Sequence, residues 1–298
     1  MKFLSKKTEL IFNNISYGTD NRQTLDMIFD KNAVHVIVFI HGGAYFTGNK
    51  LEYPSFLLDC SKNNIFASID YRVIETNNDI QMSDILSDVD DALSKIIEIS
   101  NANGAKIKDF ILVGHSAGGH IGLLYGYKDF LKNKRIKVSA IISLAGPTDF
   151  SDDLGWSSMT MWGKNVDERL SFLSLMGTRL TGHNIELKQR YWTKQDDYYS
   201  FKKYILDISP ITYVSKTEEI PPTLLIHAQQ DDQVPYTNSV RLKAMLDTAF
   251  VPNKLISPTG NGNSHMLGGI INANNEPIQF KDQDWVNKAK EWIETYLK

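Results

Sequence analysis

The chain has 298 residues, of which 42% are hydrophobic and 22% are charged. This composition is typical of a globular protein and is too apolar for an intrinsically disordered one. The net charge is −3, so the sequence offers no strong overall field for nucleic acid or for an anionic membrane. Cys60 is the only cysteine, which excludes an internal disulfide framework and a cysteine-based zinc or iron–sulfur cluster.

Neither targeting nor membrane insertion is indicated by the sequence. The first eight residues carry lysines but no apolar run follows them, unlike a secretory signal. No window approaches the roughly 18 apolar residues of a membrane-spanning helix. We therefore expect a cytoplasmic protein without a membrane span, whose partner is a small molecule.

Predicted strands begin close to the N-terminus. Segments 11–17 and 25–29 flank a turn signal at 18–21 and predict an antiparallel hairpin at the edge of a sheet. Short runs rich in β-branched residues follow, and such near-continuous apolar runs are typical of strands covered on both faces. These predicted strands are 34–40, 65–69, 110–113, 138–144 and 223–226.

Helical patterns alternate with these strands, at 85–97, 117–131 and 284–297. The alternation predicts an α/β fold with a mostly parallel central sheet and helices on both faces. At roughly 150 residues per domain the length suggests two domains. The motifs described below nevertheless run in order from residue 41 to residue 265 along one predicted sheet. We therefore expect a single domain, 1–298, with an inserted cap-like segment at about 151–207.

The 151–207 segment contains no strand-like run and is rich in aromatic residues. A structureless loop of this length is improbable in a compact domain, so we expect a lid-like insertion of short helices. Inserted elements often form pocket walls, which makes Trp156 and Trp162 candidate substrate-binding residues. The alternative is an aromatic subcore that only supports surface helices.

The chemistry is indicated first by Gly114-His115-Ser116-Ala117-Gly118, which matches G-x-S-x-G. The pattern alone is weak, but here a predicted strand enters it and a predicted helix leaves it. A serine on so tight a strand-to-helix turn projects above the carboxyl edge of the sheet, as a nucleophile must. The alternative is an ordinary turn in which Ser116 caps the helix.

A second glycine-rich turn, His41-Gly42-Gly43-Ala44-Tyr45, follows the strand 34–40. Adjacent glycines allow backbone N–H groups to face a ligand. Together with the amide after the nucleophile, such groups can hold a developing oxyanion. A phosphate-binding loop is the alternative, but the downstream glycine and lysine spacing that it needs is missing.

The general base and the acid should follow Ser116 in the chain. His265 is the last of seven histidines and lies in a turn-rich loop beyond the last predicted strand, so it is the candidate base. We expect Asp231 to be the acid because it follows the strand 223–226. Asp232 and Asp149 remain alternatives. His115 is a candidate pocket neighbour.

Taken together, these motifs resemble the α/β-hydrolase superfamily, in particular its hormone-sensitive-lipase-like esterases and their carbohydrate-esterase and kynurenine-formamidase relatives. The resemblance implies Ser116 as nucleophile, His265 as general base and Asp231 as acid. It also implies that the oxyanion hole is formed by the amides of Gly43, Ala44 and Ala117. The motifs that carry it include Asp70-Tyr71-Arg72, Ser209-Pro210 and the segment from His227 to Pro235.

The sequence departs from the pattern of these relatives at three positions, one of which is Ala228 in place of the usual glycine before the acid. Ala44 stands where lipase-like members have a third glycine, and Tyr45 stands where related subfamilies often have tryptophan, so we treat Tyr45 as a candidate substrate-binding residue. The expected activity is hydrolysis of small carboxylic esters, with short acyl groups on a sugar or aryl alcohol, through an acyl-enzyme. No cofactor or metal is expected. The alternatives are an arylformamidase acting on N-formylkynurenine-like amides and a hydrolase-fold binding protein without turnover.

Overall fold

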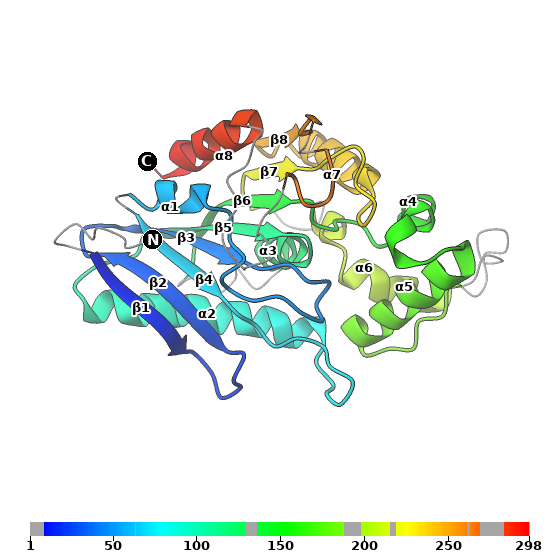
Figure 1. The fold of residues 1–298 in the computed structure, drawn as a ribbon, viewed down its shortest axis with the longest axis horizontal. Coiled ribbons are helices and arrows are strands. Elements are labelled where there is room, and N and C mark those ends of the chain that lie inside the picture. The colour runs from blue at the N-terminus through cyan, green and yellow to red at the C-terminus, as the bar shows by residue number, and fades with distance from the viewer. Residues whose placement is uncertain are drawn as a thin grey trace.

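Eight strands form one sheet in the computed structural model, which describes residues 9–62, 64–128, 136–187, 198–214, 219–260, 263–268 and 283–297. The strand order is β1-β2-β4-β3-β5-β6-β7-β8 (Figure 1). The first two strands pair antiparallel at one edge, which confirms the predicted hairpin, and β2 is also antiparallel to β4. From β4 onward the strands β4, β3, β5, β6, β7 and β8 are parallel to one another. The strands are β1 (Glu9–Ser16), β2 (Thr24–Asp30), β3 (His35–Ile40), β4 (Ile65–Ile69), β5 (Asp109–His115), β6 (Val138–Leu144), β7 (Thr223–Ile226) and β8 (Asn253–Ile256).

Helices cover both faces of the sheet. One face carries α2 and α3, and α1 and α8 lie on the other face (Figure 1). The helices are α1 (Phe56–Cys60), α2 (Met82–Ala102), α3 (Ala117–Tyr127), α4 (Asp153–Ser158), α5 (Val166–Thr181), α6 (Tyr198–Asp207), α7 (Tyr236–Thr248) and α8 (Gln283–Tyr296). Among the described helices, none is long and apolar enough to cross a membrane.

The central strand β3 shows why its sequence is apolar from Val36 to Ile40. Its six residues are all buried. Successive side chains of a strand point to opposite faces of the sheet, and here each face is covered by a core layer. Val36, Val38 and Ile40 pack with the α2 and α3 side of the sheet. Ile37 and Phe39 pack with α1 and with Trp285 of α8 on the opposite side. Both faces of this strand are covered by core, which explains the apolar run from Val36 to Ile40. His35, at the start of the strand, is buried beside Asp109, with Nδ1 2.6 Å from Oδ1 of the carboxylate.

Two helices differ from the sequence prediction. The predicted helix 117–131 ends at Tyr127, because Lys128 turns into an extended conformation with φ −82° and ψ 150°. The predicted helix 85–97 is longer and begins at Met82, where Gln81 and Asp84 form a reciprocal capping box. Helices α1 and α7 and strand β8 are additional elements that the pattern analysis did not predict.

The described part of the predicted insertion is mostly helical and contains no strand. It contains α4, a short 3-10 helix η2 (Thr160–Trp162), α5 and α6, all beyond the carboxyl ends of the strands (Figure 1). Residues 188–197, including Tyr191 and Trp192, lie outside the described residues. We refer to the described helices of this segment as the cap.

The carboxyl ends of the parallel strands bring the two glycine-rich motifs together. Ile40 at the end of β3 pairs with Gly114 of β5, so the turn after β3 begins beside Ser116. On the other side, His115 pairs with Leu144 of β6. The backbone N–H of Ser116 donates to the Leu144 carbonyl at 2.7 Å. The candidate residues therefore meet at one edge of the sheet.

Candidate active site

Ser116 occupies the sharp turn between β5 and α3. Its backbone has φ 53° and ψ −121°, a conformation that L-residues rarely adopt and that typically costs on the order of 1–3 kcal/mol. The turn is also crowded, because a Cβ at Gly114 would lie 2.2 Å from the backbone of Gly118, and a Cβ at Gly118 would lie 2.0 Å from the Ile40 carbonyl oxygen. Only glycine fits either position. Ser116 is half-buried, whereas its neighbours His115 and Ala117 are buried.

The structure brings His265 and Asp231 to this serine in a linear relay. His265 Nε2 lies 3.0 Å from Ser116 Oγ, and His265 Nδ1 lies 2.8 Å from Asp231 Oδ2. A carboxylate oxygen only accepts, so the Nδ1–H of His265 donates to Asp231 and leaves the Nε2 lone pair facing the serine hydroxyl. Both His265 and Asp231 are buried.

Asp231 is ionised and fully hydrogen-bonded. Its Oδ1 accepts the backbone N–H groups of Gln233 and Val234, each at 2.8 Å. Its Oδ2 also lies 3.2 Å from Nε2 of His227. Burial alone would raise the carboxyl pKa, but the hydrogen bonds from His227 and His265 outweigh it and hold the pKa of Asp231 well below its usual value.

The alternative acids lie elsewhere. The Asp149 carboxylate faces Arg241, at 2.9 Å, beneath the cap, and Asp232 is exposed next to the Asp231 loop. His227 begins the motif that the sequence offered for Asp231, but no role had been assigned to its side chain. Its Nδ1 accepts a hydrogen bond from the Ser239 hydroxyl at 2.7 Å. The proton is therefore on Nε2, which donates to Asp231 and to the Val234 carbonyl. A histidine four residues before the acid was the available signal.

His115 lies next to His265, the candidate base. Burial, and next the neighbouring His265, lower the pKa of His115 to about 3, so its ring is neutral at pH 7. Its Nε2–H donates to the backbone carbonyl of His265 at 3.1 Å. The side chain is only 7% exposed. The geometry therefore ties His115 to the backbone of the base rather than to an open pocket.

The turn after β3 presents unusual backbone angles. The φ values of Gly43, Ala44 and Tyr45 are 104°, 50° and 71°. Gly43 and Ala44 are half-buried. The turn is stabilised from within, because the Gly43 carbonyl accepts the N–H groups of Phe46 and Thr47 at 3.0 and 3.1 Å. Beside it, Ala117 opens α3, and the Ser116 carbonyl accepts the N–H of His120 at 3.1 Å.

Tyr45 points inward, which corrects our expectation of a substrate-binding side chain. It is 1% exposed, and its hydroxyl lies 2.9 Å from Nδ1 of His120 on α3. Since Nε2–H of His120 donates to the Ile208 carbonyl at 2.7 Å, Nδ1 is the acceptor and Tyr45 is the donor. The two rings also meet edge to face, with centroids 5.6 Å apart. Tyr45 therefore joins the glycine-rich turn to the nucleophile helix.

Removal of the Tyr45 hydroxyl tests this connection. We expect Tyr45→Phe to lower the free energy of unfolding by about 1–3 kcal/mol, because Nδ1 of His120 is left buried without a donor. The measurement is urea unfolding followed by circular dichroism. Tyr213→Phe is the matched control, because that hydroxyl donates at the surface to the Asp207 carbonyl and water can replace it. Equal stability of Tyr45→Phe and wild type would show that the bond contributes nothing.

The two candidate cap tryptophans have different surroundings. Trp156 is buried, stacks on Phe150 with centroids 5.3 Å apart, and donates its indole N–H to the Asp149 carbonyl at 2.9 Å. Trp162 stacks on Phe172 of α5 with centroids 4.6 Å apart and donates to the Gln233 carbonyl at 2.7 Å. Trp162 thus contacts the loop whose N–H groups bind Asp231.

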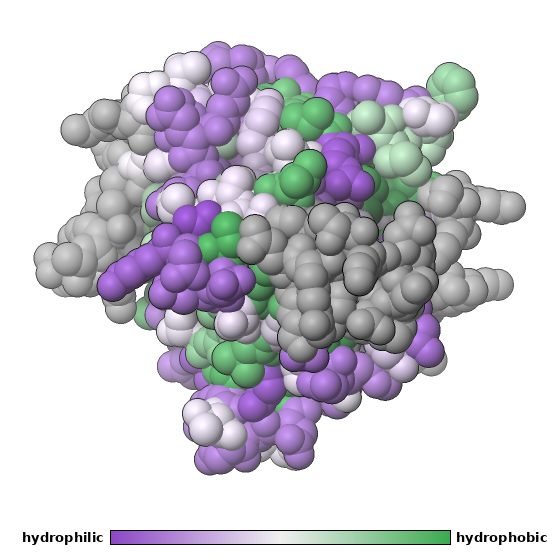
Figure 2. Space-filling view, turned by 90° about the vertical axis from the view of Figure 1, so that its right-hand side faces the viewer, coloured by the Kyte–Doolittle hydropathy of each residue, from purple (hydrophilic) through white to green (hydrophobic). Residues whose placement is uncertain are grey.

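A small apolar cavity lies inside the cap. Its volume is about 30 Å³, which is room for little more than a water molecule. Figure 2 looks onto this end of the molecule, where hydrophobic residues run between hydrophilic flanks. The cavity is lined by Phe150, Trp156, Leu170, Leu173, Met176, Gly177, Leu180, Ile185, Leu187, Ile205 and Ile208.

The described residues contain no group of three or more histidine, cysteine, aspartate or glutamate side chains arranged to hold a metal ion. On the acidic helix α2, Asp88 is fully buried and forms an ion pair with Arg72 at 2.7 Å. Its Oδ1 also accepts from the Gln23 amide at 2.8 Å. The acidic pattern of α2 thus includes a structural ion pair.

Comparisons with known proteins agree with this architecture. The family model described as BD-FAE matches residues 25–246. A probable isoprenylcysteine alpha-carbonyl methylesterase of Oryza sativa subsp. japonica is 25% identical over 262 residues, which are 83% of this chain and 56% of that protein. The chain therefore spans about half the length of this relative.

Solved structures share the fold at low sequence identity. A truncated form of a carbohydrate esterase from gut microbiota has a TM-score of 0.70 and 19% identity, with 97% of both chains covered. Esterase B from Lactobacillus rhamnosis has a TM-score of 0.69 and 17% identity, with 97% of this chain and 85% of that chain covered. At this level of identity the likeness shows the fold, and the predicted α/β-hydrolase fold is confirmed.

Proposed function

The chain belongs to the BD-FAE family, and from that premise we propose that it is a serine hydrolase that cleaves small carboxylic esters through an acyl-enzyme. The observation that carries the proposal is the relay from Ser116 to His265 at 3.0 Å and from His265 to Asp231 at 2.8 Å. Nucleophile, base and orienting acid are thereby within hydrogen-bond reach in the order that acyl transfer requires.

In the first half of the reaction, Ser116 Oγ attacks the ester carbonyl carbon while His265 Nε2 takes the hydroxyl proton. The N–H groups of Gly43, Ala44 and Ala117 hold the oxyanion, and Asp231 stabilises the imidazolium. The tetrahedral intermediate then collapses, and His265 gives its proton to the oxygen of the leaving alcohol. An acyl group remains on Ser116.

In the second half, a water molecule replaces the alcohol. His265 takes a proton from this water as it attacks the acyl carbonyl, and the same three N–H groups hold the second oxyanion. Collapse returns the proton to Ser116 Oγ and releases the carboxylic acid. The steps use only these side chains, the backbone amides, substrate and water.

We propose short acyl groups, carried by a sugar or an aryl alcohol, as the substrate class. Two observations support this choice. The cap is tightly filled, with a cavity of about 30 Å³ between its apolar side chains. Similar chains include proteins named as a carbohydrate esterase and as esterases.

The test of the proposed function compares p-nitrophenyl acetate, butyrate and octanoate with N-formylkynurenine. We expect turnover of the acetate and butyrate esters, with a lower kcat/KM for octanoate. Faster turnover of N-formylkynurenine than of every ester would identify an arylformamidase instead. Absence of turnover on all four, together with no labelling by a fluorophosphonate probe, would contradict the hydrolase proposal.

The contact between the cap and the acid loop gives a separate prediction. We expect Trp162→Phe to lower kcat/KM for p-nitrophenyl butyrate about five-fold. The ring stack on Phe172 is kept, but the hydrogen bond of about 1 kcal/mol to the Gln233 carbonyl is lost. The measurement is steady-state kinetics at pH 7.

Trp292→Phe is the matched control for this prediction. The indole nitrogen of Trp292 on α8 is buried and has no hydrogen-bond partner among the described residues, so its removal should leave kcat/KM unchanged. If both variants behave alike, the cap does not act on the acid loop through Trp162.

A further inference from the structure

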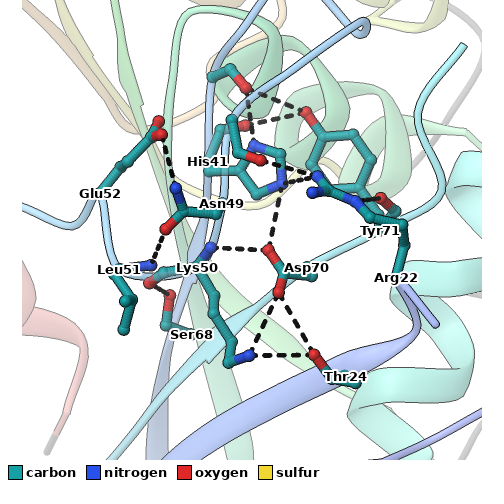
Figure 3. Close-up of polar contacts among 12 residues, drawn as sticks. Arg22, Thr24, His41, Asn49, Lys50, Leu51, Glu52, Ser68, Asp70 and Tyr71 are labelled. Carbon is teal, nitrogen blue, oxygen red and sulfur yellow. Dashed lines mark hydrogen bonds and ion pairs between the residues drawn. The ribbon is translucent and has the colours of Figure 1, made fainter. Parts of the chain in front are cut away.

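A buried polar network lies behind the glycine-rich turn, with His41 at its centre (Figure 3). His41 directly follows β3 and is 0% exposed. Its Nδ1 lies 2.7 Å from the carbonyl oxygen of Gly42. A carbonyl oxygen only accepts, so this contact requires the proton on Nδ1. Burial lowers the pKa of His41 to about 4, so the ring is neutral at pH 7 and Nε2 carries a lone pair.

Two charged groups approach Nε2 and favour opposite tautomers. The Arg22 guanidinium lies 3.5 Å away and can only donate, which favours the observed tautomer. The Asp70 carboxylate lies 3.7 Å away and can only accept, which favours a proton on Nε2. With the proton on Nε2, the bare Nδ1 would face the Gly42 oxygen at 2.7 Å, an unfavourable contact between two acceptors.

Neighbouring groups weaken the pull of Asp70. Its Oδ1 accepts the backbone N–H of Lys50 at 2.7 Å, and its Oδ2 forms an ion pair with Lys50 Nζ at 3.2 Å and accepts from Thr24 at 3.3 Å. On the ring face, Tyr71 stacks on His41 with centroids 4.2 Å apart. Arg22 is thus the cation that contacts Nε2 of His41 directly, and Lys50 neutralises Asp70, the carboxylate that would favour the other tautomer.

The tautomer of His41 matters because of the peptide that it contacts. A trans peptide unit is planar, so fixing the Gly42 carbonyl also fixes the direction of the Gly43 N–H. This peptide lies against the nucleophile, since a Cβ at Gly42 would be 3.2 Å from Cβ of Ser116. An accepted hydrogen bond at the carbonyl also polarises the N–H at the other end of the amide.

We propose that Arg22 is a positioning residue for the oxyanion hole. Its guanidinium holds His41 in the tautomer whose Nδ1–H anchors the Gly42–Gly43 peptide, and so it orients the Gly43 N–H. The inference rests on the proposed function, because it assigns that N–H to the oxyanion. Arg22 also donates to the Gly48 carbonyl at 2.7 Å, a purely structural contact that the test has to separate from the effect on His41.

The tautomer of His41 can be read directly by long-range ¹H–¹⁵N correlation spectra of protein labelled on its histidines, with His41→Gln as the assignment control. We expect a protonated Nδ1 in wild type. In Arg22→Met we expect the proton to move partly or wholly to Nε2. We also expect kcat for p-nitrophenyl butyrate to fall about 10- to 100-fold with KM within two-fold, because one oxyanion donor is displaced. Arg22→Lys, which keeps the charge, should recover much of both properties.

Arg179→Met is the matched control, because Arg179 also donates to backbone carbonyls, those of Glu75 and Asn78, but lies on the cap helix α5. This variant should lose stability without a change in the His41 tautomer. If Arg22→Met does not fold, Arg22→Ala, in which water can donate to the Gly48 carbonyl, replaces it.

Retention of the Nδ1–H tautomer in the Arg22 variant overturns the proposal, whether kcat falls or not. A changed tautomer with unchanged kcat overturns it as well. Absence of ester turnover in wild type, by contrast, would reject the proposed function, while the spectra would still report whether Arg22 sets the tautomer.

Discussion

Replacement of Ser116 by alanine is expected to lower kcat for p-nitrophenyl butyrate by about 10⁴-fold or more. The substitution removes only Oγ, the atom that lies 3.0 Å from His265 Nε2, so the chemical step loses its nucleophile. The backbone strain at φ 53° is the same for alanine as for serine, so the fold should be retained. The measurements are steady-state kinetics and the mass of the protein after treatment with a fluorophosphonate probe.

Ser143→Ala provides the matched control in the neighbouring strand. Ser143 pairs with Gly114 across β5 and β6, and its hydroxyl is buried without a hydrogen-bond partner among the described residues. We expect this variant to keep its activity and to take up one probe molecule, whereas Ser116→Ala takes up none. Labelling of Ser116→Ala to the level of wild type would place the nucleophile elsewhere.

The second large effect is expected for Asp231→Asn, again about 10⁴-fold in kcat. Oδ1 of Asp231 accepts two backbone N–H groups, so the amide oxygen of asparagine must stay at that position. The amide NH₂ then faces His265 Nδ1, which can only accept from it. His265 is driven into the tautomer with a proton on Nε2, and this tautomer cannot take a proton from Ser116.

Two neighbouring carboxylates provide the controls. Asp232→Asn should change kcat less than two-fold, because Asp232 is exposed. Asp149→Asn weakens the ion pair between the buried Asp149 and the exposed Arg241 and should lower stability more than kcat. If Asp149→Asn proves far more damaging to kcat than Asp231→Asn, Asp231 is not the acid.

The strands that the sequence predicted have an unbroken apolar run, and the helices that it predicted have apolar residues at helical spacing. Strand β8 has neither, since only Ile256 of its four residues is buried. Helix α7 was missed because two of its four buried positions are Asn238 and Ser239, which bind backbone and side chains of other segments. Polar residues that are buried for their hydrogen bonds do not stand out in a pattern of hydrophobic residues.

The candidate site shows the same division. Motif order was sufficient to select Ser116, His265 and Asp231, which the structure brings together, and their catalytic roles remain a proposal. The direction of the Tyr45 side chain could not be read from the motif, because it depends on a positive φ and on a partner, His120, 75 residues away. The contact of Arg22 with His41 likewise joins the turn between β1 and β2 to the end of β3, and no sequence pattern indicates that these two places meet.

The cap cavity has a consequence for engineering. All of its lining residues lie between residues 150 and 208, whereas Ser116, Asp231 and His265 lie outside that interval. The segment of the chain that encloses the cavity is therefore separate from the segments that hold the proposed catalytic residues. Libraries confined to the cap can reshape the space while leaving the reactive groups untouched, provided that the Trp162 and Arg179 contacts with the rest of the protein are kept.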